Sequence, residues 1–96
     1  MLFSPKQLEH LRRATGLSRE RFAHLIGVSI ASINRWESGA SSPSGTVLAI
    51  YETINAALAR SADVSRIAAE AEVKGVPYFL YRLSEAAFGG RRRSSS

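Results

Sequence analysis

The sequence predicts an all-α protein, and three observations lead to that class. Apolar residues recur at helical spacing in several successive segments. No segment alternates apolar and polar residues in the way that a half-buried strand does. Glycine and proline divide the chain at short intervals, and small polar residues stand where helices would begin. With 96 residues, 45% of them apolar, the chain can build one compact core.

The first helix is predicted to begin at Pro5 and to end near Gly16. Ser4 stands at the N-cap position, Pro5 is at the first helical position, and Gln7 completes a capping box. Gly16 can adopt the left-handed conformation that ends many helices, because it has no Cβ atom. These signals define the helix at both ends.

Two short helices follow, and their limits are equally clear. Ser18 is placed to cap the first of them, and Gly27 is placed to end it. Ser29 is placed to cap the second, which ends at Gly39. Because so few residues separate the two helices, we expect a tight turn between them.

Three further helices are predicted in the second half of the chain. Pro43 is expected at the first helical position of a long fourth helix. Asp63 is expected to cap a fifth helix that ends at Gly75. Pro77 is expected to open the last helix, and the glycine pair at 89–90 is expected to stop it.

The composition excludes several classes of protein. There is no cysteine, so disulfides and thiolate metal sites are ruled out. No apolar run approaches the roughly 20 residues that cross a bilayer. The segment from Met1 to Lys6 lacks the apolar stretch of a secretory signal. We therefore expect a soluble, cytoplasmic protein that does not associate with membranes.

The net charge of +5 is unevenly distributed along the chain. Residues 1–39 hold six basic and three acidic side chains, whereas residues 40–88 hold four basic and five acidic ones. Arg91, Arg92 and Arg93 supply the remaining positive charge. A basic N-terminal half is typical of proteins that bind phosphate groups, although such charge can also serve solubility alone.

The segment from Leu17 to Gly39 carries the clearest functional signal. Two short helices joined by a tight turn form a helix-turn-helix arrangement when the second helix begins with small polar residues. The segment supplies a small residue where the helices approach, a glycine in the turn, and apolar residues that anchor the second helix. These are Ala23, Gly27, Val28, Ile33 and Trp36.

The second helix of this segment, residues 29–38, keeps an outer face free to enter a DNA major groove. Asn34 can bond adenine N6 and N7, whereas Arg35 can pair with guanine or turn to a backbone phosphate. Ile30 and Ala31 can pack on thymine methyl groups. The candidate base contacts are therefore Ile30, Ala31, Asn34 and Arg35.

A wider set of residues extends this interpretation over about residues 5–58. The set comprises Leu17-Ser18, Phe22-Ala23, Ile26-Gly27-Val28-Ser29, Ile33 and Trp36-Glu37-Ser38-Gly39. With these residues the chain resembles the phage repressor and Cro type of helix-turn-helix. That family of xenobiotic-response-element-like transcriptional regulators includes many antitoxins. The resemblance implies a lambda-repressor-like domain of five helices or so, a homodimer and a palindromic operator. It also implies an ion pair between Arg12 and Glu37.

The resemblance also bears on the candidate phosphate contacts. Family members often carry glutamine where this chain has Arg19, so we expect Arg19 to bind a phosphate as a charge that salt screens. Free N–H groups at the start of the fourth helix offer a second phosphate site. A solvated basic surface is the alternative interpretation of Arg19 and Arg35. The candidate phosphate contacts are Arg19, Ser29, Ser32, Ser44 and Thr46.

We expect three parts in the chain. Residues 1–60 form the DNA-binding domain, residues 61–89 form a helical extension for dimerisation, and residues 90–96 form a disordered tail rich in arginine and serine. The last helix carries more apolar and aromatic residues than its own packing needs, so we expect a two-fold dimer contact there. The candidate contacts are Tyr78, Phe79, Leu80 and Leu83.

These observations predict a sequence-specific regulator of transcription, a dimeric repressor that binds double-stranded DNA through residues 29–38. The alternative is an antitoxin that represses its own operon and binds a toxin, or another protein partner, through its C-terminal region. We expect no enzyme, because His10 and His24 lie on separate predicted helices and no catalytic or nucleotide-binding motif is present. No catalytic, cofactor-binding or metal-binding residue is predicted.

Overall fold

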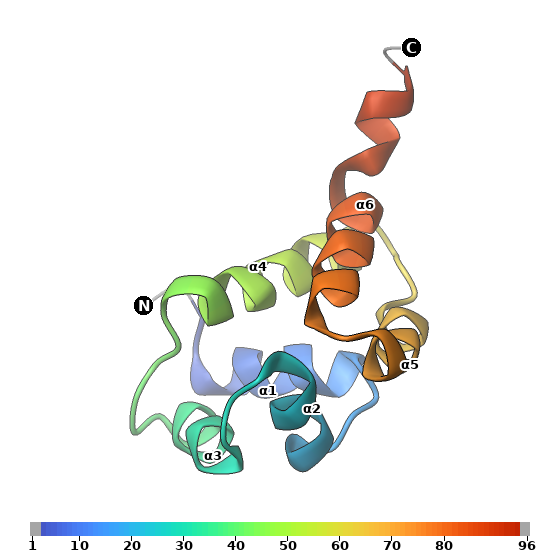
Figure 1. Ribbon diagram of the computed structural model, residues 1–96. Coiled ribbons are helices and arrows are strands. Elements are labelled where there is room, and N and C mark those ends of the chain that lie inside the picture. The colour runs from blue at the N-terminus through green and yellow to red at the C-terminus, as the bar shows by residue number, and fades with distance from the viewer. Residues whose placement is uncertain (1–2, 95–96) are drawn as a thin grey trace.

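The computed structural model describes the backbone of residues 3–94 and the side chains of residues 3–89. These residues form six helices and no strand, which confirms the all-α prediction (Figure 1). None of the described helices is long and apolar enough to cross a membrane. The helices are α1 (Pro5–Ala14), α2 (Arg19–Ile26), α3 (Ile30–Ser38), α4 (Gly45–Ala59), α5 (Val64–Lys74) and α6 (Val76–Ser94).

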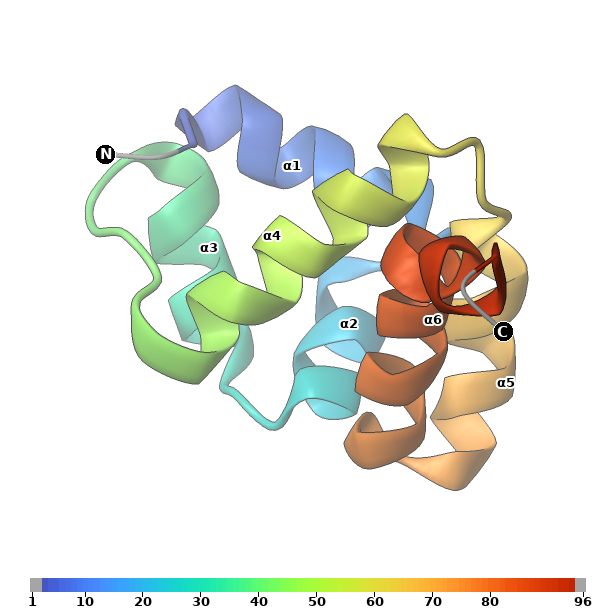
Figure 2. The ribbon, with the colours of Figure 1, turned by 90° about the horizontal axis from the view of Figure 1, so that it is seen from above.

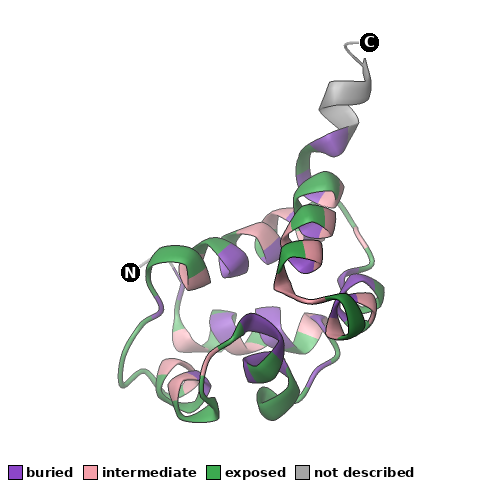
Figure 3. Cartoon of the chain, viewed as in Figure 1, coloured by how far each residue is buried: buried purple, intermediate pink, exposed green. Residues whose placement is uncertain are grey.

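The six helices share one core. Helices α1 to α4 surround its N-terminal part, while α6 packs mainly on α4 and α5 (Figures 1 and 2). The buried side chains form a single cluster that includes Phe22 and Ile33 from the first half and Phe79 and Leu83 from the second. Buried residues line the inward sides of the helices, as Figure 3 shows. The C-terminal extension is therefore continuous with the rest of the core.

Helix α6 extends beyond the body formed by the other helices. Its C-terminal end and α3 lie at opposite ends of the molecule in Figure 1. The described structure is elongated, with extents of 46 × 29 × 21 Å. The later turns of α6 consequently have no neighbouring helix beside them in Figure 1.

Most predicted helix ends are confirmed by their hydrogen bonds. The Ser4 hydroxyl accepts from the Gln7 backbone N–H at 3.1 Å, and the Gln7 side chain accepts from the Ser4 backbone N–H at 2.7 Å. The side chains of Ser18, Ser29 and Asp63 cap α2, α3 and α5 in the expected way. Because these bonds are local, short sequence patterns were enough to predict them.

Two predicted helix limits are wrong. Pro43 does not open α4, because Ser44 takes an extended backbone (φ −145°, ψ 174°) and the helix begins only at Gly45. The glycine pair at 89–90 does not stop the last helix, because α6 continues to Ser94 and its glycines do not take the left-handed backbone that ends α2 and α3. The predicted disordered tail, residues 90–96, thus continues the helix to Ser94, while Ser95 and Ser96 lie outside the described residues.

Candidate nucleic-acid interface

Helices α2 and α3 meet through a tight turn at Gly27. This glycine has a φ of 79°, a left-handed conformation that favours glycine, and its N–H donates to the Ala23 carbonyl at 2.9 Å. Ala23 is buried, so its small side chain lies where the two helices approach. Ile33 is 0% exposed and anchors α3 from beneath. The turn and the anchors together fix the orientation of α3.

The outer face of α3 is exposed along its whole length. The four predicted base-contact residues all lie on this face: Ile30, Ala31, Asn34 and Arg35. Ile30 is 46% exposed, which is unusual for so large an apolar side chain. The Asn34 side chain makes no hydrogen bond with any residue that the structure describes. An exposed isoleucine beside an unpartnered amide suits an apolar and hydrogen-bonding contact with base edges.

The polar side chains at the start of α3 bond to one another. The Ser29 hydroxyl accepts from the Ser32 backbone N–H at 3.1 Å and lies 3.0 Å from the Ser32 hydroxyl. The Arg35 guanidinium donates to the Ser32 hydroxyl at 3.3 Å. Ser29 therefore caps α3. The hydrogen bond to Ser32 holds the Arg35 side chain along the helix.

Glu37 joins three helices through its carboxylate. It accepts from Arg12 Nε of α1 at 2.8 Å and from Arg19 Nε of α2 at 2.8 Å. Its side chain is only 2% exposed, and that of Arg12 only 8%. Burial alone would raise the pKa of Glu37, but hydrogen bonds and charge from the two arginines outweigh it and lower the pKa. The Arg12–Glu37 pair implied by the family resemblance is thus present.

Arg19 stands at the start of α2, where a phosphate contact was expected. Its side chain is 46% exposed and its Nε donates to Glu37, while its two terminal NH2 groups make no hydrogen bond to the described residues. The hydrogen bond to Glu37 and the carboxylate charge raise the pKa of Arg19. Local spacing did not indicate that Glu37 also binds Arg19, because the two residues are 18 positions apart in the chain.

The other predicted phosphate contacts begin α4, on a separate element from α3. Ser44 and Thr46 are both exposed. Ser44 is the N-cap residue, but its side chain makes no capping hydrogen bond. The first backbone N–H groups of a helix have no partner within the helix, so this end can still accept an anion.

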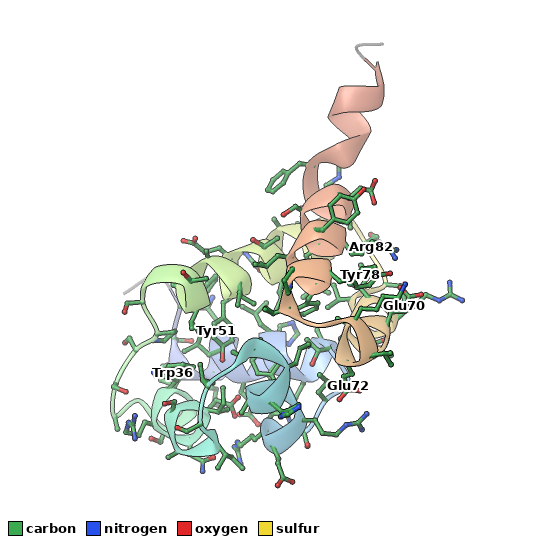
Figure 4. The ribbon with its side chains drawn as sticks, viewed as in Figure 1. Trp36, Tyr51, Glu70, Glu72, Tyr78 and Arg82 are labelled. Atoms are coloured by element: carbon green, nitrogen blue, oxygen red, sulfur yellow. The ribbon has the colours of Figure 1, made fainter. Side chains whose placement is uncertain are left out.

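Two aromatic side chains, Trp36 and Tyr51, pack together between α3 and the core. Trp36 is half-buried and packs edge-on against Tyr51 of α4, with ring centroids 6.3 Å apart (Figure 4). The prediction that Trp36 belongs to the core is therefore confirmed. The Tyr51 hydroxyl is buried without a hydrogen-bond partner among the described residues, and burial raises its pKa.

The predicted dimer contacts require a correction. Phe79 and Leu83 are both 0% exposed, because they fill the space between α6 and its neighbours in the same chain. The expectation that Phe79 and Leu83 are left over from the packing of their own chain and free for a dimer contact is therefore wrong. Leu80 and Tyr78 are half-buried, and the Tyr78 hydroxyl donates to Glu70 at 2.8 Å and accepts from Arg82 at 2.7 Å (Figure 4).

An ion pair that sequence reasoning missed joins α2 to the C-terminal extension. Arg21 donates to Glu72 of α5 through Nε at 3.0 Å and through its terminal nitrogen at 2.6 Å. The hydrogen bond from Arg21 to Glu72 and the charge of that carboxylate raise the pKa of Arg21. No local spacing could have revealed this contact, because the two residues are 51 positions apart.

Comparison with known proteins agrees with this geometry. A family model described as helix-turn-helix matches residues 8–54. The chain is similar to proteins named uncharacterized HTH-type transcriptional regulator YiaG from Escherichia coli strain K12 and from E. coli O157:H7. Each is 40% identical over 50 residues, which cover 52% of this chain and 52% of the relative. The chain thus spans about half the length of the curated relatives that it matches. No solved structure matches it.

Proposed function

Because residues 8–54 match a helix-turn-helix family model, we propose that the chain is a sequence-specific DNA-binding regulator of transcription. It acts as a dimeric repressor on a palindromic operator, with α3 in the major groove. The observation that carries the proposal is the exposed outer face of α3. This face presents the apolar side chain of Ile30 and the amide of Asn34, while the buried Ile33 anchors the helix on the opposite side. The relatives that share this segment are named as transcriptional regulators, which supports the same role.

The roles of the side chains on α3 follow from their chemistry. Asn34 bonds the N6 and N7 atoms of adenine, because its amide both donates and accepts. Arg35 leaves the Ser32 hydroxyl and pairs with guanine O6 and N7 or with a phosphate. Ile30 and Ala31 pack on base methyl groups, where their lack of hydrogen-bonding atoms is no disadvantage.

Phosphate contacts set the register of the protein on the duplex. Arg19 supplies a charge-assisted contact, since Glu37 fixes its Nε and leaves its terminal NH2 groups for a phosphate oxygen. The backbone N–H groups behind Ser44 and Thr46 supply a second contact at the start of α4. Ser29 and Ser32 contribute hydroxyls near the first turn of α3.

The test is selection of bound sequences from a random double-stranded DNA library at physiological salt. The expected result is an enriched palindrome with half-sites about one helical turn apart. Retention without enrichment that disappears as salt rises would mean phosphate attraction alone and would overturn the proposal.

The Asn34→Ala variant tests whether α3 is the helix that contacts the bases. We expect it to lose discrimination at one base pair of each half-site, by about 1–3 kcal/mol, while it stays folded. Asn55→Ala is the matched control, because Asn55 is an exposed asparagine on α4. Quantitative binding to the selected site and to sites with single base-pair changes makes the measurement. If the two variants changed the discrimination between base pairs equally, α3 would not be the helix that contacts the bases.

A further inference from the structure

The amide of Asn34 is the one polar group on the outer face of α3 without a hydrogen-bond partner among the described residues. Arg35, the other polar residue of this face, donates to the Ser32 hydroxyl at 3.3 Å. The Ser32 hydroxyl in turn lies 3.0 Å from that of Ser29. The polar groups around Asn34 are therefore bonded to one another, and the amide is left to be satisfied by a base.

The amide stands beside apolar side chains. Ile30 precedes Asn34 by four residues, so the two lie on one side of α3, about 6 Å apart along its axis. Ile30 is 46% exposed, and Ala31 is exposed as well. Neither side chain can donate or accept a hydrogen bond, and in a major groove both exclude water from the space around the amide. A base that meets Asn34 must therefore satisfy the donor and the acceptor of the amide directly.

We propose that the chain binds its operator less tightly when the adenine that meets Asn34 carries a methyl group on N6. This inference rests on the proposed function, in which Asn34 bonds N6 and N7 of an adenine in each half-site. Adenine presents an N6–H donor and the N7 acceptor to the major groove. Its second N6–H pairs with thymine. The DNA that this site rejects is thus a chemically defined form of its own operator.

A methyl group on N6 removes the donor that Asn34 needs. The methylated nitrogen keeps one hydrogen, which stays in the base pair with thymine, so the methyl group faces the major groove. The carbonyl oxygen of Asn34 then meets a methyl group in place of an N–H. Adenine N7 is unchanged, but the amide can no longer make both of its bonds.

The lost hydrogen bond outweighs any gain from packing the methyl group. Contact between the methyl group and Ile30 is worth about fourfold in affinity. A carbonyl that is buried without a partner costs roughly fivefold to 150-fold. Even the smallest cost exceeds the gain, so methylation weakens binding.

The two-fold symmetry of the proposed complex makes the response graded. In a palindrome, the adenine that meets Asn34 in one half-site and its equivalent in the other half-site lie on opposite strands. A duplex methylated on one strand loses one of the two contacts, and a duplex methylated on both strands loses both. Because replication leaves only the old strand methylated, the chain binds a methylated operator more tightly just after it is copied.

Duplexes of the selected operator test the proposal. N6-methyladenine is placed on neither strand, one strand or both, at the adenine for which Asn34→Ala loses discrimination. Fluorescence anisotropy at fixed salt should show the affinity of the unmodified chain falling roughly fivefold to 150-fold with each methylated strand. Methylation of an adenine outside the half-sites is the control and should change nothing. Equal affinity for the three duplexes, or tighter binding of the methylated ones, would overturn the inference.

Variants of α3 assign the effect to one side chain. Asn34→Ala should no longer bind the methylated duplexes more weakly than the unmethylated one, because it has no carbonyl to leave unpartnered. Arg35→Ala removes the other polar side chain of the outer face and should keep the response to methylation. Asn55→Ala, at an exposed position on α4, should respond as the unmodified chain does. A response that persists in Asn34→Ala would contradict the assignment.

Selection from two libraries separates this inference from the proposed function. One library contains ordinary adenine, and the other contains N6-methyladenine at every adenine. We expect a palindrome to be enriched from the first library and the same palindrome to be absent from the second. Enrichment of one palindrome from both libraries would overturn only this inference, as would a palindrome without adenine where Asn34→Ala loses discrimination. Enrichment from neither library would overturn the proposed function and this inference with it.

Discussion

The two halves of the molecule share one apolar core but differ in where their charged side chains lie. In the DNA-reading half, α1, α2 and α3 meet at the buried carboxylate of Glu37, which two arginines neutralise. In the C-terminal half, α6 is attached through Phe79 and Leu83, apolar side chains with 0% exposure, while its ion pairs lie at the surface. The stability that comes from a buried ion pair changes with pH and with the loss of either charged partner. The stability that comes from apolar packing depends mainly on how well the side chains fit together.

This difference has a functional consequence. Arg19 is hydrogen-bonded to the same carboxylate that ties α1 to α3, so the proposed phosphate contact and the fold of the N-terminal half depend on one residue. The C-terminal half has no residue with a comparable double role, because the exposed Tyr81 and Phe88 of α6 do not contribute to its core. Substitutions in the two halves should therefore differ in how much they lower stability and in how that loss depends on pH.

The largest effect on stability is expected in the C-terminal half. Phe79→Ala leaves a cavity in the core between α6 and its neighbours, and we expect a loss of about 3–5 kcal/mol in the free energy of unfolding. Urea denaturation makes the measurement, with the exposed Ser84→Ala on the same helix as the control. A loss no larger than that of the control would mean that α6 is not part of the core.

A somewhat smaller loss is expected for the buried charge. Glu37→Gln keeps the size of the side chain but leaves the buried Arg12 without its counter-charge, so we expect a loss of about 3 kcal/mol. The exposed glutamate of α4 provides a matched control, Glu52→Gln. The same urea experiment should show little change for that control. Similar midpoints for the two variants would contradict the role assigned to Glu37.

The pH dependence of stability distinguishes the two halves further. The pKa of Glu37 is lower in the folded chain than its ordinary value of 4.5, so the unfolded chain takes up the proton first as pH falls. Its contribution is complete above that ordinary value and is lost as pH falls through the folded pKa. We expect the stability difference between the unmodified chain and Glu37→Gln to shrink over that range. The loss caused by Phe79→Ala should stay constant, and a parallel decline would refute the contrast.

The smallest effect is expected for the exposed ion pair between α2 and α5. Arg21 is 61% exposed in its pair with Glu72, and solvent screens such a pair strongly. We expect Arg21→Ala to shift the thermal midpoint much less than either core variant. The control is Arg13→Ala, which removes another exposed pair, between Arg13 and Glu9. A large and specific shift for Arg21→Ala would show that charge, as well as the apolar core, attaches the extension.

Local patterns explain how much of the fold could be predicted. The caps at Ser4, Ser18 and Asp63 are satisfied within four residues, so the sequence contains both partners of each bond. The start of α4 was misplaced because Ser44 takes an extended backbone, so the helix begins at Gly45 and not at Pro43. The end of α6 was misplaced because a glycine stops a helix only when it takes the left-handed conformation.

The sequence by itself determined the helices, the tight turn at Gly27 and the residues on the outer face of α3, because these depend on spacing and local hydrogen bonds. Only the tertiary structure decided which side chains meet across the chain. It added Arg19 to the carboxylate that was expected to pair with Arg12, joined Arg21 to Glu72, and buried Phe79 while leaving Tyr81 exposed. The physical reason is that burial and long-range ion pairs depend on how helices pack against one another, which the apolar period of a single helix does not specify.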